Sequence, residues 1–249
     1  MYFYSIIFLI YNIRQVMNSN KKIKFITLSN DGYINYTINC LKSLELINFK
    51  EKLNCYVIGE NCHNHLRSKG YNSVLLNSVS KGDNRFSVFR TGNWHNITKR
   101  KFDIIYSNLL ENDYVCFTDG DIVFLDNKFM DFCENFIEDN DIIIQNDSCD
   151  DNTDKLCSGF MFIKSTEKTL ELFNPKNVAK FVRQNWDDQV YINNIKNNLK
   201  FRKLPLQLFP NGGYYYKNFN KIKPMMIHFN WLIGHNKQKM MKKFNYWFL

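Results

Sequence analysis

Alanine and proline are scarce in this chain of 249 residues. Ala179 is the only alanine, proline occurs four times, and no Pro/Gly-rich stretch or internal repeat interrupts the sequence. Because nothing marks a linker, an obvious division into several domains is excluded and a single domain is predicted. The missing alanines accompany an excess of Asn, Lys, Ile, Phe and Tyr, which we attribute to an AT-rich coding genome rather than to chemistry.

Long apolar runs are missing as well. The apolar stretch from Tyr2 to Ile13 is well short of the roughly 20 residues that a membrane-spanning helix needs. No basic residue precedes it, as a secretory signal would require. Residues 1–16 are therefore interpreted as a weak membrane-surface anchor or, alternatively, Met17 is the true start. We treat residues 1–22 as an extension and residues 23–249 as the domain.

The seven cysteines form no motif with paired spacing. Reduced thiols and a cytoplasmic setting fit this pattern best. The segment Cys62-His63-Asn64-His65 lacks the two separated ligand pairs of a structural zinc site, so a zinc site there is not favoured.

The formal net charge is +9, and much of the excess lies between Lys217 and Lys243. The lysines are otherwise scattered, and no RNA-binding signature is present. A solvated surface that attracts anionic substrates is therefore favoured over a nucleic-acid partner. Hydrophobic residues make up 45% and charged residues 23% of the chain, which is typical of a globular protein with a packed core.

Apolar residues recur with alternating strand and helix periods from residue 24 onwards. The runs Lys24–Leu28, Tyr56–Gly59 and Ser73–Leu76 read as strands, and Ile34 to Ile47 has the three- and four-residue spacing of a helix. This alternation predicts an α/β fold, in which helices flank a mainly parallel central sheet. Polar loops at residues 76–92 and 146–155 are expected to shape substrate specificity.

Two carboxylates follow a strand that is expected to be buried. Tyr114–Thr118 is a continuous apolar run, and it ends in Asp119-Gly120-Asp121. Open α/β sheets place ligands at the carboxyl ends of such strands. Asp119 and Asp121 offer hard oxygen ligands for Mg²⁺ or Mn²⁺, and Gly120 allows a phosphate to approach the backbone. By itself, the pattern fits a solvated turn equally well.

A second element near the C-terminus favours the metal site. An apolar segment, Met226-Ile227, leads into His228, and Gly234 and Lys237 follow. An imidazole is a further ligand for manganese, and a lysine offsets the charge of a diphosphate. The alternative for Gly234 and Lys237 is a turn followed by a solvated helix.

These elements, taken in order, resemble those of the nucleotide-diphospho-sugar transferase domain with the GT-A fold. The resemblance extends from about Phe25 to Trp247 and rests on five segments: Tyr114–Leu125, Cys157-Ser158-Gly159-Phe160, Trp186-Asp187-Asp188-Gln189, Phe209-Pro210-Asn211-Gly212 and the His228 segment. Family members commonly carry an asparagine where this chain has Cys157, so the contacts to the donor sugar are the part that the resemblance leaves open.

The resemblance implies a role for each matching residue. Asp119 contacts the ribose or the metal, and Asp121 and His228 ligate Mn²⁺ or Mg²⁺. The other implied donor contacts are made by Thr27, Lys101, Ser158, Gly159, Gly234 and Lys237. Asp188 is expected to bind the transferring sugar and Gln189 to face the reacting carbon.

Several of these residues also have simpler interpretations. Lys101 fits an exposed helix charge, Gly159 a glycine at the start of a strand, and Thr27 an ordinary threonine at the end of one. Asp188 fits an acidic residue that favours a helix N-terminus, and its neighbour Asp187 stays an alternative to it.

The expected reaction is the transfer of a sugar from a nucleotide-diphosphate donor to an acceptor hydroxyl, with retention of anomeric configuration. The acceptor, a glycan, protein or lipid, is not specified by the sequence. Two other functions stay open. Phe117–Val123 also resembles the nucleophile motif of haloacid-dehalogenase-type phosphatases, with Asp119 and Asp121 as the reacting pair. The net charge and the aromatic content would fit a basic nucleic-acid-binding module.

Overall fold

Strands and helices alternate through the first half of the chain, as the spacing of its apolar residues predicts. A computed structural model describes residues 21–77, 85, 94–181 and 187–249. The elements of this half are β1 (Ile23–Asn30), α2 (Ile34–Leu46), β2 (Asn54–Ile58), α3 (Glu60–Ser68), β3 (Ser73–Leu76), α4 (Trp94–Leu109) and β4 (Tyr114–Thr118). Residues 1–20 and most of the loop predicted at residues 76–92 lie outside the described residues.

The second half contains shorter elements. They are β5 (Ile122–Phe124), α5 (Phe129–Phe136), β6 (Ile142–Asn146), β7 (Leu156–Lys164), α6 (Glu167–Phe173), α7 (Pro175–Phe181), α8 (Asp188–Ile195), β8 (Phe201–Lys203), α9 (Gly212–Asn218), β9 (Met226–His228) and α10 (His235–Lys243), with a 3₁₀ turn at Lys196–Asn198. The polar segment at residues 147–155 contains no helix or strand.

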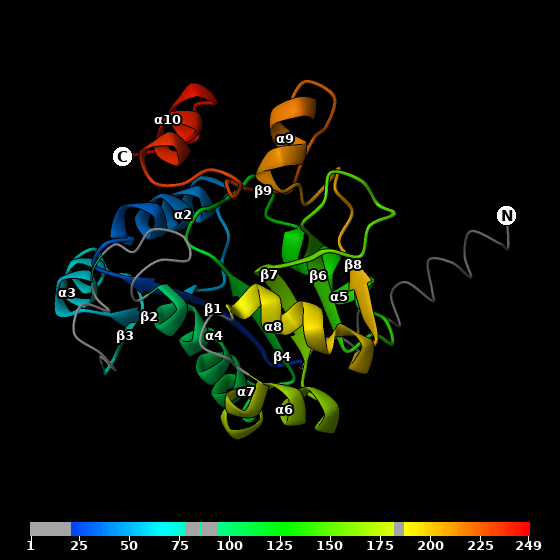
Figure 1. Cartoon of the computed structure of the whole chain (residues 1–249). Helices are drawn as coiled ribbons and strands as arrows, with labels where there is room; N and C mark the ends of the chain where they lie inside the picture. The colour runs from blue at the N-terminus through cyan, green and yellow to red at the C-terminus, as the bar shows by residue number, and fades with distance from the viewer. Residues whose placement is uncertain (1–20, 78–84, 86–93, 182–186) are drawn as a thin grey trace, which may run out of the picture.

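Seven strands form one sheet in the order β3-β2-β1-β4-β7-β6-β8 (Figure 1). The pairs β1–β2, β2–β3, β1–β4 and β6–β8 are parallel. Strand β7 runs antiparallel to both of its neighbours, β4 and β6. The prediction of a mainly parallel sheet is confirmed. Parallel neighbours need a crossover connection, which α2 and α3 supply between β1, β2 and β3.

Both faces of the sheet are covered, because successive side chains of a strand point to opposite faces. Phe25, Cys116 and Phe162 pack on one face with apolar residues of α2, α3 and α5. Ile26 and Phe117 pack on the other face with residues of α4, α6, α7 and α8. The central strands therefore read as continuous apolar runs, and their polar carboxyl ends are where a site can form.

A small second sheet connects the C-terminal part of the chain to the segment that follows β4. Strand β5 pairs with β9 in antiparallel register, and Ile122 lies opposite His228. Aromatic residues of α2, α9 and the segment after α10 pack around this ribbon. Among the residues that the structure describes, none of the helices is long and apolar enough to cross a membrane.

Candidate active site

Three side chains from two distant segments of the sequence, Asp119 and Asp121 from one and His228 from the other, meet at the end of β4. The backbone N–H of Asp119 donates to the carbonyl of Gly159 at 2.7 Å, and the N–H of Phe229 donates to the carbonyl of Asp121 at 3.1 Å. These backbone bonds fix the acidic turn between β7 and the segment that follows β9. His228, which ends β9, is thereby placed over both carboxylates.

The ligand atoms of these residues lie close enough to share one cation. Nε2 of His228 is 3.3 Å from Oδ1 of Asp121 and 3.9 Å from Oδ2 of Asp119. One ligand atom from each of the three residues lies within 4.8 Å of the others. Two hard carboxylate oxygens and one imidazole nitrogen suit Mn²⁺ or Mg²⁺. The described residues therefore fit the metal site that the sequence predicts.

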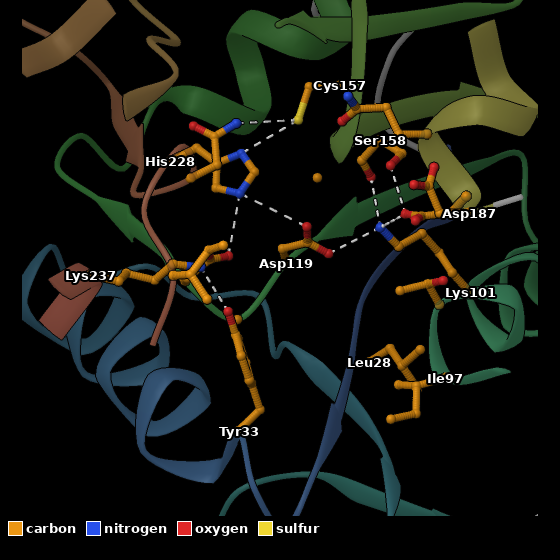
Figure 2. A pocket seen from close by; sticks show the side chains of 18 of the residues that line it. Leu28, Tyr33, Ile97, Lys101, Asp119, Cys157, Ser158, Asp187, His228 and Lys237 are labelled. Carbon is orange, nitrogen blue, oxygen red and sulfur yellow. Dashed lines mark hydrogen bonds and ion pairs between the residues drawn. The ribbon is translucent and has the colours of Figure 1, made fainter. Parts of the chain in front are cut away.

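Lys237 and Lys101 lie on opposite sides of Asp119 (Figure 2). Lys237 is the partner of Asp121. Its ammonium group forms an ion pair with Oδ2 of Asp121 and donates to the hydroxyl of Tyr33 at 2.7 Å. Burial by itself would raise the pKa of Asp121, but Lys237 and His228 together hold that pKa well below its usual value. Asp121 is therefore ionised and available as a ligand at any physiological pH.

The pKa of His228 is shifted in the opposite direction, upwards. Burial by itself would lower the pKa of its imidazole, but the carboxylate of Asp121 raises the pKa to about 10. Both ring nitrogens are in contact with polar groups, since Nδ1 lies 2.7 Å from Oε1 of Gln145. The ring is 3% exposed, so its orientation is fixed by these partners.

A second ion pair lies on the other side of the carboxylates. Nζ of Lys101 is 3.1 Å from Oδ1 of Asp119 and forms a short contact with Oδ2 of Asp188. It also donates to the carbonyl of Ser158 at 3.1 Å, and the Ser158 hydroxyl donates to Asp188 at 2.6 Å. Burial would lower the pKa of Lys101, but Asp119 and Asp188 raise it above its ordinary value. Lys101 is 3% exposed, so it is not the surface charge that the alternative interpretation supposed.

The adjacent residues Asp187 and Asp188, where α8 begins, make different contacts. Asp187 is the N-cap, and its Oδ1 accepts from the N–H of Val190 at 2.7 Å. Asp188 instead turns toward Lys101 and Ser158. Capping the helix is thus the task of Asp187, which leaves Asp188 free to face the cavity. Gln189 donates to Oδ2 of Asp147 at 3.0 Å.

These groups line a cavity of about 360 Å³, within the usual range for small-ligand sites. Lys101, Asp119, Asp121, Ser158, Gly159, Asp188, Gln189, His228, Gly234 and Lys237 all contribute to its wall. Thr27 does not: it is fully buried in β1, and its hydroxyl has no hydrogen-bond partner among the described residues. Its neighbours Leu28, Ser29 and Asn30 line the cavity instead.

Gly159 and Gly120 lie so close to neighbouring side chains that a Cβ atom would not fit. A Cβ on residue 159 would collide with the ring of His228, and one on residue 120 would lie 2.7 Å from the hydroxyl of Thr37. Gly159 lies inside β7, so it is not a glycine at the start of a strand. Gly234 is the N-cap of α10 with φ of 51°, which favours glycine. The turn proposed for it is present, and the residue also borders the cavity.

Sequence reasoning missed three residues of this region. Tyr33 contacts Lys237, Gln145 contacts His228, and Trp231 lines the cavity while donating to Asp147 at 3.2 Å. Gln145 could have been noticed, because a polar residue that ends the run Ile142–Ile144 marks the carboxyl end of a buried strand. Tyr33 and Trp231 offered no comparable signal among so many aromatics.

Comparisons with known proteins agree with this geometry. Residues 50–242 match the family model for nucleotide-diphospho-sugar transferases. A curated relative, UDP-galactose:fucoside alpha-3-galactosyltransferase of Dictyostelium discoideum, is 26% identical over an alignment that covers 55% of this chain and 25% of that protein. The chain thus matches only about a quarter of the length of this relative.

Solved glycosyltransferases share the fold. The galactosyltransferase LgtC, in complex with donor and acceptor sugar analogues, has a TM-score of 0.54 at 14% identity, covering 82% of this chain and 86% of its own. Mouse xyloside xylosyltransferase 1 has a TM-score of 0.54 at 12% identity, covering 84% and 98%. These likenesses confirm the predicted GT-A fold.

The phosphatase alternative does not fit. Its motif normally follows the first strand of the domain, whereas Asp119 follows β4, which three strands precede in the chain. The family match covers the acidic turn, the β7 segment, α8 and the His228 segment together. The chain belongs to the nucleotide-diphospho-sugar transferase family.

Proposed function

We propose that this protein transfers a sugar from a nucleotide-diphosphate donor to an acceptor hydroxyl, using Mn²⁺ or Mg²⁺ bound by Asp119, Asp121 and His228. One observation carries the proposal: three ligand atoms from two distant segments lie within 4.8 Å of one another at the wall of a cavity. Two buried lysines flank the same point, so the site is built for an anionic ligand as well as a cation.

The leaving group needs the most help in this reaction, because a nucleoside diphosphate departs with accumulating negative charge. A bound divalent cation supplies Lewis-acid stabilisation of that charge. Lys237 is placed to add to it, since the residue is 7% exposed and borders the cavity, and its ammonium contacts the carboxylate of Asp121. Hydrogen-bond donors in a buried site stabilise a developing anion more than they would in water.

The sugar end of the cavity is proposed to lie at Asp188 and Gln189. The carboxylate of Asp188 is oriented by Lys101 and by the Ser158 hydroxyl, so it can accept hydrogen bonds from sugar hydroxyls. Gly159 leaves room beside His228. Gln189 is oriented by Asp147, and we assign it to the side of the reacting carbon. Thr27, which lies behind the cavity wall, would support the nucleotide through Leu28 and Ser29.

Retention of anomeric configuration is part of the proposal. An inverting transfer needs a base that takes the proton from the acceptor hydroxyl. Each carboxylate of the cavity wall already has a partner: Asp119 and Asp188 contact Lys101, Asp121 contacts Lys237, and Asp187 caps α8. No carboxylate of the described wall is thus left as a dedicated base, which supports a retaining route.

The donor is proposed to be a hexosyl or pentosyl nucleotide. The Dictyostelium relative is named for UDP-galactose, and the solved neighbours include a xylosyltransferase, so UDP-galactose and UDP-xylose are the first donors to try. The acceptor is a glycan, a protein or a lipid.

Seven free thiols, six of them buried, support a reducing, cytoplasmic setting. Membrane contact through residues 1–16 stays a prediction.

A donor panel tests the proposal. The protein is incubated with UDP- and GDP-sugars in Mn²⁺, Mg²⁺ or EDTA, and the release of nucleoside diphosphate is measured. We expect hydrolysis of one donor that requires the cation and is lost in Asp121→Asn. Asp139→Asn, a change at an exposed carboxylate, serves as the matched control and should keep full activity. Release that is indifferent to EDTA and to Asp121→Asn would overturn the metal-dependent mechanism.

A further inference from the structure

Gln145 lies next to the metal ligand His228 without lining the cavity. It is fully buried near the end of β6. Its Oε1 is 2.7 Å from Nδ1 of His228, and its Nε2 donates to the carbonyls of Phe209 at 3.2 Å and Pro210 at 3.0 Å. All of its hydrogen-bonding groups are thus directed at fixed partners.

The two carbonyls decide which way the amide points. A carbonyl oxygen only accepts hydrogen bonds, so the NH₂ group must face Phe209 and Pro210. Oε1 must then face the imidazole. Because an amide oxygen cannot donate, the Nδ1 atom of His228 must carry the hydrogen of this bond.

The hydrogen on Nδ1 determines what the other nitrogen can do. A histidine ligates a metal ion in its neutral form, which carries one hydrogen. When a cation displaces the second proton of His228, the hydrogen held by Gln145 stays on Nδ1 and Nε2 presents its lone pair. Nε2 is the atom that lies 3.3 Å from Asp121 and 3.9 Å from Asp119. The opposite tautomer would direct an N–H group at the place where a cation would bind.

An irregularity in the sheet places Gln145 at this point. The register between β6 and β7 shifts between Ile144, which pairs with Met161, and Gln145, which pairs with Cys157. Bulges of this kind re-aim a side chain and occur beside active sites. Both Gln145 and Cys157 thereby come to Nδ1 of His228, with the Cys157 sulfur at 3.7 Å. A thiol is a weak partner, and its distance is longer by a full ångström.

We propose that Gln145 is a positioning residue for the metal site: it holds His228 in the tautomer and orientation that offer Nε2 to the cation. The inference rests on the proposed function, because it assumes that His228 is a metal ligand. Partners of this kind fix ligand orientation, and their loss typically weakens metal affinity by about 10- to 100-fold.

Mn²⁺ titration by calorimetry or electron paramagnetic resonance tests the proposal without measuring turnover. Gln145→Met keeps the volume and removes every hydrogen bond, so we expect its dissociation constant for Mn²⁺ to rise by about 10- to 100-fold. Gln145→Glu keeps an acceptor oxygen and should bind Mn²⁺ more tightly than Gln145→Met. Cys157→Ala changes the other neighbour of Nδ1 and should leave the affinity nearly as it is.

Two results would overturn the inference. One is wild-type affinity in Gln145→Met, and the other is a loss in Cys157→Ala as large as in Gln145→Met. Should Gln145→Met fail to fold, long-range ¹H–¹⁵N spectra of the wild-type protein with Mg²⁺ decide: a hydrogen on Nδ1 of His228 is expected, and a hydrogen on Nε2 contradicts the proposal. Absence of Mn²⁺ binding by the wild type would instead overturn the proposed function itself.

Discussion

The imidazole of His228 lies directly against the backbone of Gly159. A Cβ atom on residue 159 would overlap Cε1 of the ring and would lie 2.8 Å from Oδ2 of Asp119. The positions of His228 and Asp119, two of the three proposed metal ligands, therefore require that residue 159 on β7 has no side chain. Glycine at position 159 lets β9 approach β7 closely enough for His228 to lie over the carboxylates.

Gly159→Ala should disturb the metal site before it disturbs the fold. Overpacking a buried position costs about 1–3 kcal/mol of unfolding free energy, and we expect Mn²⁺ binding to be lost as His228 is displaced. Chemical denaturation and Mn²⁺ titration measure the two effects. In a His228→Ala background the overlap with the imidazole is gone and only the contact with Oδ2 of Asp119 is left, so the cost should fall. An equal cost in both backgrounds would show that the clash lies elsewhere.

Lys101→Met should destabilise the protein strongly. The substitution leaves the carboxylate of Asp188, whose side chain is 5% exposed, without its counter-charge, and removing one partner of a buried pair costs about 3–5 kcal/mol. Lys101→Met/Asp188→Asn should regain much of this loss. Lys200→Met breaks an exposed pair with Asp139 and should change stability by no more than about 1 kcal/mol. Equal losses from Lys101→Met and Lys200→Met would contradict the role of burial.

The sequence is sufficient to predict the fold and most of the residues that the structure brings together around the cavity, because both are recorded in local patterns. Buried central strands appear as apolar runs, and Asp119, Asp121 and His228 stand at the ends of such runs. The resemblance to a family then adds Lys101 and Asp188, which line the cavity together with Lys237.

What the sequence could not show depends on register and on side-chain direction. The sequence predicts Thr27 near the nucleotide, but its side chain is fully buried, and Leu28, Ser29 and Asn30, which lie nearer the carboxyl end of β1, line the cavity instead. Gln145 reaches His228 only because the β6–β7 register shifts. Asp187 and Asp188 are adjacent acidic residues, and their different roles follow from where α8 begins. Short elements such as β8 and α9 carry too few residues for a periodic pattern.

Phe129→Ala should lower the free energy of unfolding by about 3–5 kcal/mol. The ring of Phe129 is fully buried and lies within 4.4–6.4 Å of the ring centroids of Phe25, Phe49, Phe124 and Phe160. Phe219→Ala is the matched control, because Phe219 is 44% exposed and should lose much less. Urea denaturation of both variants measures the difference. Similar losses would contradict the burial assigned to Phe129.

Thiol reactivity should single out Cys149. Six of the seven cysteines are buried, and Cys149 is partly exposed. Burial raises the pKa of Cys62 to about 11 and that of Cys55 to about 12, so these thiols are protonated as well as inaccessible at neutral pH. A chromogenic disulfide reagent should titrate one thiol quickly in the native protein and seven in denaturant. Cys149→Ser should remove the fast phase, and a fast phase that survives this change would contradict the prediction.

Lys237→Met should separate the leaving-group step from metal binding. The ammonium of Lys237 contacts the same carboxylate that we assign to the cation, so the two positive charges repel each other at Asp121. Removing the lysine should therefore leave the affinity for Mn²⁺ unchanged or increase it. The rate of nucleoside-diphosphate release at saturating donor and Mn²⁺ should nevertheless fall on the order of 100-fold, as when one donor to a developing anion is removed. His228→Ala is the comparison, because it should lower affinity and rate together. If Lys237→Met weakens Mn²⁺ binding as His228→Ala does, Lys237 holds Asp121 in place rather than stabilising the departing diphosphate.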